Sequence, residues 1–333
     1  HGLTFGPDPA THTHNTLGGM LGNNSCGTHS VEAHRTSDNT HSMDILTYDG
    51  LRMTVGALTE EELDKHCGVA DREGGIYRGL RSIRQRYGEE VRARFPNIPR
   101  LVSGYALDQL LPEKGCHVAR ALVGSESTCV TILRATLNLI PDPPHKRLLV
   151  IGFDAIEHAA DAVPFILKYK PIALEAVDDQ LVSYMRKKGL LTAYLRHLPK
   201  GNSWLLAQFG GDTPEQARAH AQALQKTLPG DRHVTDSHLL EDPEARAEMW
   251  RVREAGLPAT AFVPGMRDTW EGWEDSAVHP DKLGAYVRDF KALFEKYDNH
   301  GAIYGHFGDG LIHTRIDSGL HTEEEILHFR RYL

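Results

Sequence analysis

Segments with the pattern of short strands alternate with segments of helical periodicity through the second half of the sequence. Aliphatic runs predict strands at 147–153, 172–177 and 204–209. Apolar residues three or four positions apart predict helices at 155–169, 178–188, 214–228, 243–255 and 282–297. Thr213 and Asp242 precede two of these helices as N-cap residues. This alternation predicts an α+β layer with helices on one side of an open sheet.

The first half of the sequence is organised differently. Residues 1–58 are rich in Gly, Asn, Ser, Thr and His, and their glycines indicate a ligand-binding loop rather than a core element. Asp49-Gly50 predicts a two-residue turn between strands at 45–48 and 51–55. A helical insertion is expected at about 59–97, bounded by Pro96 and Pro99, and further strands are expected at 118–123 and 130–137.

The proline-rich run at 141–144 marks a domain junction. The length of 333 residues fits two domains, which we place at 1–140, including the insertion, and at 145–333. The chain begins at His1 and ends at Leu333 inside a helical pattern. We therefore expect a piece of a longer protein, whose second domain is incomplete at its C-terminal end.

The composition argues against several classes of protein. Lys and Arg number 37 and Asp and Glu 45, a net charge of −8 with no basic cluster, which argues against a nucleic-acid partner. No apolar run approaches the roughly 20 residues that span a bilayer. The four cysteines (Cys26, Cys67, Cys116 and Cys129) are scattered without a CxxC pair, which predicts reduced thiols in a cytoplasmic protein.

The segment 303–316, with the sequence IYGHFGDGLIHTRI, carries the strongest chemical signal. If Asp309-Gly310 forms a two-residue turn, paired positions sum to 619 and His306 lies directly across from His313. Tyr304 and Arg315 then share the face of these histidines. The opposite face carries an apolar stripe, formed by Ile303, Phe307, Ile312 and Ile316.

Two imidazoles about 5 Å apart on one face can converge on a single metal ion. An arginine beside such a site is favourable when an anion joins them, which suggests an anionic substrate. Two alternatives remain open from the residues alone. The pair can belong to a metal-dependent hydrolase, or it can be part of a solvated hairpin face that binds nothing.

Several motifs resemble those of the FAD-linked D-2-hydroxy-acid dehydrogenases, which have the fold of the vanillyl-alcohol-oxidase and p-cresol-methylhydroxylase flavoprotein family. Residues 305–310 with His313 are similar to the GHxGDG…H motif of these enzymes. Residues 16–27 resemble their flavin-binding loop, residues 124–128 their G-[ST]-E-G-T segment, and residues 250–254 the helix whose arginine binds the substrate carboxylate. The likeness is greatest to large bacterial members in which an iron–sulfur domain follows.

The resemblance implies a partial FAD-binding domain followed by a ferredoxin-like cap domain. It implies that FAD contacts Thr16, Gly18, Gly19, Gly22, Asn23, Asn24, Ser25, Gly27, Gly124, Ser125, Glu126 and Thr128. It also implies a zinc-like divalent metal on His306 and His313, with a third ligand, a glutamate, beyond Leu333. The sequence departs from the family pattern at Ser127, where glycine is usual, at Cys129, where an aliphatic residue is usual, and at Arg315, where relatives carry asparagine.

The activity implied is oxidation of a D-2-hydroxy acid (D-2-hydroxyglutarate, D-lactate or glycolate) to the 2-oxo acid by hydride transfer to FAD. Arg253, aided by Arg315, would bind the substrate carboxylate. An iron–sulfur centre or a quinone would accept the electrons, in the cytoplasm or peripherally at the inner membrane. Two other readings are that Arg253 only stacks on Trp250, and that this chain is a catalytically incomplete fragment. The oligomeric state stays open.

Overall fold

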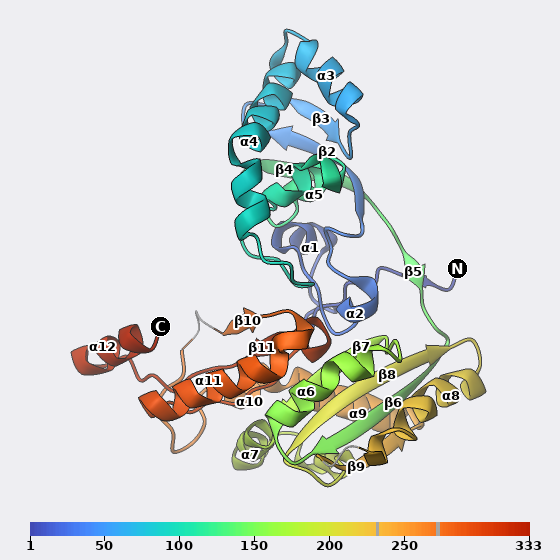
Figure 1. The fold of residues 1–333 in the computed structure, drawn as a ribbon, viewed down its shortest axis with the longest axis vertical. Helices are drawn as coiled ribbons and strands as arrows, with labels where there is room; N and C mark the ends of the chain where they lie inside the picture. Colours follow the sequence, from blue (N-terminus) through green and yellow to red (C-terminus); the bar gives the residue numbers. More distant parts are fainter. Residues whose placement is uncertain (231–232, 271–273) are drawn as a thin grey trace. The chain divides into compact units, whose positions relative to one another are not determined.

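The computed structural model describes residues 1–230, 233–270 and 274–333. The chain forms two compact units (Figure 1), which divide between Asp142 and Pro143. Residues 3–142 with His1 make the first unit, and residues 143–333 with Gly2 make the second. Among the described residues, no helix is both long enough and apolar enough to cross a membrane.

The first unit is built on a three-stranded antiparallel sheet of order β3-β2-β4, with a separate two-stranded pair, β1-β5. Its strands are β1 (Leu3–Thr4), β2 (Thr40–Thr47), β3 (Arg52–Val55), β4 (Val130–Leu137) and β5 (Ile140–Pro141). Its helices are α1 (Leu17–Asn23), α2 (Ser30–Ala33), α3 (Glu60–Gly68), α4 (Arg72–Arg94), α5 (Val118–Leu122) and the 3-10 turns η1 (Leu107–Leu110) and η2 (Pro112–Lys114).

The predicted helical insertion and hairpin are present. Thr59 and Glu62 form a capping box that begins α3, and Asp71 caps α4. The hairpin joins β2 to β3 with Leu46 opposite Arg52. Thr47 N–H then donates to the carbonyl of Leu51, so the turn comprises three residues, 48–50, rather than two. Apolar residues of this sheet and of both helices form the core of the unit.

Two local predictions for the first unit were wrong. Residues 118–123 are mostly helical (α5) rather than a strand, because the segment packs in the core and Arg120 donates hydrogen bonds to the carbonyls of Asp38 and Thr40. The glycine-rich segment is also not only loop. Thr16 accepts a hydrogen bond from Gly19 N–H and begins the short helix α1, whose Leu21 is buried.

The second unit contains a four-stranded antiparallel sheet of order β7-β8-β6-β9. Its strands are β6 (His145–Phe153), β7 (Ala173–Asp178), β8 (Ser203–Gly211), β9 (Val234–Leu240), β10 (Asp275–Ala277) and β11 (Leu311–His313). Its helices are α6 (Ile156–Leu167), α7 (Asp179–Lys188), α8 (Pro214–Gln225), α9 (Pro243–Glu254), α10 (Gly256–Thr260), α11 (Leu283–Tyr297) and α12 (Glu323–Tyr332). Its 3-10 turns are η3 (Thr192–His197), η4 (Leu228–Gly230), η5 (Pro280–Lys282) and η6 (Phe307–Asp309).

In chain order, this sheet and its helices follow the βαββαβ pattern of a ferredoxin-like unit, with α7 added between β7 and β8. The ferredoxin-like prediction is therefore confirmed. The N-caps predicted at Thr213 and Asp242 are also confirmed, since each side chain accepts a hydrogen bond from the first turn of its helix.

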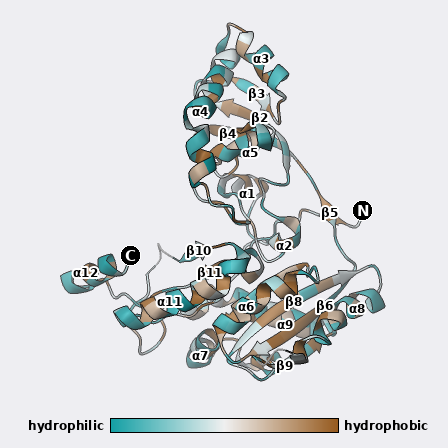
Figure 2. Ribbon diagram, viewed as in Figure 1, coloured by the Kyte–Doolittle hydropathy of each residue, from teal (hydrophilic) through white to brown (hydrophobic). Residues whose placement is uncertain are grey.

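Helices on one side of the sheet were predicted, but both sides are covered. Leu148 and Val150 of β6 pack with Met249 and Val252 of α9. The residues between them in β6 point to the opposite face and are equally buried, and α6 and α8 contact the sheet there. Hydrophobic residues on both faces therefore make up the greater part of β6 and β8 (Figure 2).

Candidate active site

The segment 303–313 folds differently from the predicted two-residue hairpin. Tyr304 pairs with His313, so paired positions sum to 617 rather than 619, and the 3-10 turn η6 lies between them. Gly310 has a φ of +74°, and a Cβ there would lie 2.0 Å from the carbonyl oxygen of Val278. The close approach of the Val278 backbone therefore requires a glycine at this position of the wider turn.

Neighbouring strands hold this segment on both sides. Gly305 forms a bridge with Ala176 of β7, whose other edge pairs with β8. Leu311–His313 forms β11, which pairs with β10 and places His313 opposite Asp275. The site is thus built on the outer strand of the four-stranded sheet.

The predicted proximity of the two histidines is present despite the different register. The rings of His306 and His313 lie edge to face, with centroids 4.9 Å apart. His306 Nδ1–H donates to Glu175 Oε1 at 2.8 Å, and His313 Nδ1–H donates to Asp275 Oδ1 at 2.5 Å. Each imidazole is therefore oriented by a carboxylate on its Nδ1 side.

Glu175 links His306 to Arg253. Its side chain is only 1% exposed, and Oε2 lies 2.7 Å from Arg253 Nη2. The Arg253 guanidinium lies over the Tyr304 ring, 5.3 Å from its centroid. Arg253 Nε and Nη2 are buried and make no hydrogen bond of good geometry with any residue that the structure describes.

Two further carboxylates complete the electrostatic arrangement. Arg315 is buried and donates from Nε to Glu274 Oε1 at 2.6 Å. Asp178 accepts hydrogen bonds from Ile303 N–H at 2.6 Å and Leu181 N–H at 2.8 Å, which ties the site segment to the start of α7. Burial raises the pKa of Asp178 to about 7, while these two bonds oppose the increase.

The histidine pair fits a divalent metal as two of its ligands. Histidines that ligate metals usually donate the other ring N–H to a carboxylate or carbonyl, as His306 and His313 do through Nδ1. Nε2 is then the nitrogen that would face the ion. Within residues 1–230, 233–270 and 274–333, no third His, Cys, Asp or Glu forms a three-ligand group with this pair.

In the first unit, the two segments implied to bind FAD lie beside each other. Gly124 N–H donates to the carbonyl of Leu21 at 2.8 Å, and Glu126 N–H donates to that of Gly22 at 3.0 Å. Gly18 and Gly22 leave one side of α1 without side chains, and no atom of the residues that the structure describes lies within 4 Å of where a Cβ of Gly22 would be. A planar group can approach the backbone closely on such a surface.

The exposed members of the predicted FAD set are Thr16, Gly18, Gly19, Asn23, Glu126 and Thr128. Ser125 is buried, and Thr128 Oγ1 donates to its carbonyl at 2.6 Å. Ser127 has a φ of +61°, a left-handed conformation that favours the glycine usual in the family.

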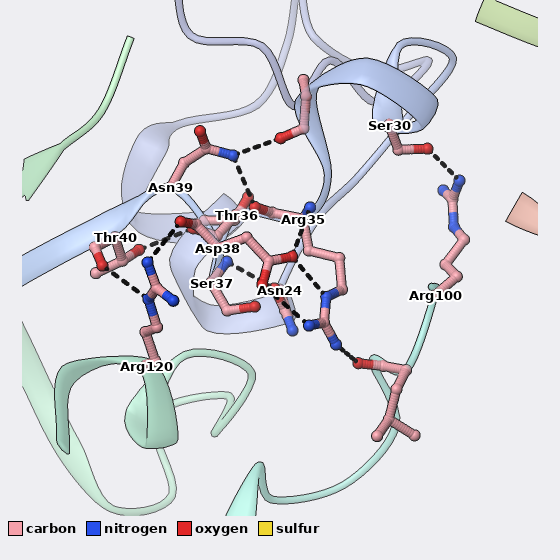
Figure 3. Close-up of polar contacts among 12 residues, drawn as sticks. Asn24, Ser30, Arg35, Thr36, Ser37, Asp38, Asn39, Thr40, Arg100 and Arg120 are labelled. Carbon is pink, nitrogen blue, oxygen red and sulfur yellow. Dashed lines mark hydrogen bonds and ion pairs between the residues drawn. The ribbon is translucent and has the colours of Figure 1, made fainter. Parts of the chain in front are cut away.

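Three other predicted FAD residues hold the fold itself. Asn24 is buried and its Oδ1 accepts a hydrogen bond from Ser37 N–H at 2.9 Å (Figure 3). The carbonyl of Ser25 accepts bonds from Thr36. Gly27 is buried, and a side chain does not fit there because a Cβ would lie 1.8 Å from the Asp8 carbonyl oxygen.

Sequence reasoning missed the charges that organise both units. In the first unit, Arg35 pairs with Asp38 at 2.8 Å, and Arg120 donates to the backbone carbonyl of Asp38 in the same loop (Figure 3). Arg100 donates to the Oγ atom of Ser30 at the start of α2. Burial alone would raise the pKa of Asp38, but its hydrogen bonds and charge interaction with Arg35 lower that pKa overall. In the second unit, Glu175 had a visible signal, since it is a charged residue inside an otherwise apolar strand.

Comparisons with known proteins agree with this architecture. The family model described as "FAD linked oxidases, C-terminal domain" matches residues 142–330, and "FAD binding domain" matches residues 1–56. The D-2-hydroxyglutarate dehydrogenase of Pseudomonas putida is 27% identical over 323 residues, which cover 95% of this chain and 32% of that protein. The D-lactate dehydrogenase of Archaeoglobus fulgidus is 26% identical, with 100% of this chain and 60% of that protein covered.

Solved structures show the same fold at low identity. An alkyldihydroxyacetonephosphate synthase matches with a TM-score of 0.57 and 16% identity, over 99% of this chain and 54% of that one. The 4-ethylphenol oxidase of Gulosibacter chungangensis matches with a TM-score of 0.55 and 12% identity, over 99% of this chain and 61% of that one. The chain spans about a third of the length of the D-2-hydroxyglutarate dehydrogenases that it matches. The predicted family is confirmed: the chain belongs to the FAD-linked oxidases, with the vanillyl-alcohol-oxidase and p-cresol-methylhydroxylase fold.

Proposed function

We propose that the chain supplies flavin-binding and substrate-binding parts of an enzyme that oxidises a D-2-hydroxy acid to the 2-oxo acid. The names of its relatives support this reaction class. In the first unit, α1 and residues 124–128 would contact FAD. When bound, FAD accepts the hydride that leaves Cα of the substrate.

The observation that carries the proposal is the buried guanidinium of Arg253. Its side chain is 8% exposed, and although Nη2 lies 2.7 Å from the Glu175 carboxylate, neither Nη2 nor Nε makes a well-formed hydrogen bond with the described residues. Buried donors without well-placed acceptors are costly, and a carboxylate can accept from two guanidinium N–H groups at once. We infer that the substrate carboxylate supplies these acceptors.

His306 and His313 would face the hydroxyl of a substrate held in this way. Glu175 holds the His306 ring by its Nδ1 and so presents Nε2 toward the substrate. This nitrogen can accept the hydroxyl proton or, with His313, hold a divalent metal. A metal bound there would act as a Lewis acid and lower the pKa of the hydroxyl.

Arg315 would determine the length of the acid. Arg315 pairs with Glu274, so the second carboxylate of a longer substrate would bind the Arg315 guanidinium in place of the Glu274 side chain. We include in the proposal a preference for the dicarboxylate D-2-hydroxyglutarate over D-lactate or glycolate. An iron–sulfur centre or quinone as electron acceptor, and a cytoplasmic location or a peripheral one at the inner membrane, belong to the same proposal.

The test is Arg253→Met in the complete protein with FAD, assayed with a D-2-hydroxy acid and a dye acceptor. Losing one partner of a buried charged pair costs about 2–4 kcal/mol, so kcat/KM should fall roughly 30- to 1,000-fold. The matched control is Arg251→Met, an exposed arginine on the same helix, which should leave kcat/KM within about twofold. Equal effects of the two substitutions would contradict the assignment.

A further inference from the structure

Three metal-ligating side chains meet at one end of the four-stranded sheet, outside the site described above. Asp154 follows β6, His158 lies in the first turn of α6, and His233 precedes β9. One ligand atom from each lies within 4.8 Å of the others. Among the His, Cys, Asp and Glu residues that the structure describes, no other group of three meets this spacing.

A single carboxylate faces both imidazoles. His158 Nδ1 lies 2.6 Å from Asp154 Oδ1, and His233 Nδ1 lies 3.1 Å from Asp154 Oδ2. The two rings are stacked, with centroids 3.6 Å apart and planes inclined by 25°. The same edge of each ring is therefore turned toward one point beside the carboxylate.

Regular structure holds the three residues in place. Phe153 pairs with Val234 across β6 and β9, and Asp154 N–H donates to the carbonyl of His233 at 3.2 Å. Asn202 Nδ2 donates to the carbonyl of Asp154 at 3.0 Å. His158 lies one helical turn after Asp154, so its position is set by α6. Ligands on such rigid elements are already close to the geometry that binding needs.

We propose that Asp154, His158 and His233 bind a divalent transition-metal ion of the zinc class. Two imidazole nitrogens and a carboxylate oxygen are the ligands that Zn²⁺ and its neighbours prefer. With bonds of about 2.0–2.1 Å, two ligand atoms on one ion lie at most about 4.2 Å apart, so little movement is required. The side chains are partly exposed, which leaves room for water in the remaining coordination positions.

Binding would cross-link parts of the chain that are distant in sequence. Asp154 and His158 belong to the β6–α6 connection, whereas His233 belongs to the segment that enters β9. An ion that binds the folded site and not the unfolded chain raises the stability of the second unit. The ion would therefore stabilise the second unit from a site that is separate from the His306–His313 pair.

The experiment starts from the double variant His306→Ala/His313→Ala, which removes the other candidate ligands. Equilibrium dialysis against Zn²⁺ should give one ion per chain, and Zn²⁺ should raise the unfolding temperature. Adding His158→Ala, or Asp154→Asn as a near-isosteric second variant, removes a metal ligand. Zinc affinity should then fall by more than the roughly 10- to 100-fold that is lost when only a hydrogen-bond partner of a ligand is removed. The rise in unfolding temperature should disappear with it.

The control is His238→Ala in the same background. His238 is exposed on β9 and faces one carboxylate, Asp236 at 3.5 Å, so its removal should leave zinc binding unchanged. Circular dichroism without zinc verifies that each variant is folded. The proposal is overturned if the background protein binds no zinc, or if the His158→Ala and Asp154→Asn variants retain one ion with unchanged affinity.

Discussion

Replacing Glu175 by glutamine removes the charge that lies between His306 and Arg253. The side chain is 1% exposed, and its two oxygens are 2.8 Å from His306 Nδ1 and 2.7 Å from Arg253 Nη2. Removing one partner of a buried ion pair leaves the other charge uncompensated and costs about 3–5 kcal/mol. We expect Glu175→Gln to lower the free energy of unfolding of the second unit by this amount.

The assay is urea unfolding followed by tryptophan fluorescence, because all four tryptophans of the sequence lie in residues 143–333. The matched control is Glu157→Gln, whose carboxylate pairs with Lys291 at 2.8 Å but is more exposed. Glu157→Gln should lower the free energy of unfolding by about 1 kcal/mol or less. In the double variant Glu175→Gln/Arg253→Met the uncompensated charge is gone, so the loss should be smaller than the sum of the single losses.

The reasoning is refuted if Glu175→Gln costs no more than Glu157→Gln, or if the two single losses are additive in the double variant. In kinetics, Glu175→Gln should also lower turnover about 10- to 100-fold in the complete protein, because it releases the His306 ring. Unchanged turnover would show that the carboxylate does not orient that ring.

Three other predictions concern the backbone, the pH dependence and the substrate. Gly310→Ala should lower the free energy of unfolding of the second unit by more than the about 1–2 kcal/mol that a left-handed alanine costs, because its Cβ would also meet the Val278 carbonyl. The control is Gly189→Ala, where φ is +65° and the space is open, so only the conformational cost should appear in the same unfolding assay. Burial and the charge of Arg120 lower the pKa of His117 to about 4. His117 should therefore contribute about 1–3 kcal/mol to the free energy of unfolding above pH 6.5, and this contribution should be lost as the pH falls toward 4. His117→Asn should therefore lose less stability than the parent between pH 7.5 and 5 when unfolding is followed by circular dichroism. Arg315→Met should lower kcat/KM for D-2-hydroxyglutarate at least about tenfold more than for D-lactate, and equal losses would remove Arg315 from substrate selection.

Local signals in the sequence were sufficient for much of the fold. Thr213 and Asp242 act as N-caps as predicted, because a cap depends on residues within one turn. The hairpin around Asp49-Gly50 is present for the same reason. The resemblance at 305–313 also indicated the correct family, although it did not supply the geometry.

The predictions that failed depend on contacts between distant residues. The segment 303–313 contacts the backbone of Val278, whose N–H donates to the carbonyl of Gly310 at 3.0 Å, and this contact exists only after folding. Residues 118–122 are helical because the core and Arg120 hold them there, against the strand preference of Val118. Coverage of both faces of the sheet could have been inferred from the nearly continuous apolar run in β6, which does not alternate with polar residues.

The candidate site was found only in part. His306, His313 and Arg253 came from the motif, whereas the carboxylates that orient them did not. Asp275 reaches His313 through a three-residue strand too short to recognise by periodicity. Glu175 was overlooked although a charge between apolar residues in the middle of a buried strand has to be paired.

Anaerobic reduction of bound FAD tests the central claim most directly. In the complete protein, mixing with D-2-hydroxyglutarate should bleach the oxidised flavin absorbance in a single turnover. His306→Ala should retain the flavin spectrum but should bleach far more slowly, while His238→Ala should behave like the parent. If no D-2-hydroxy acid bleaches the flavin, or if His306→Ala bleaches at the parent rate, the account is contradicted.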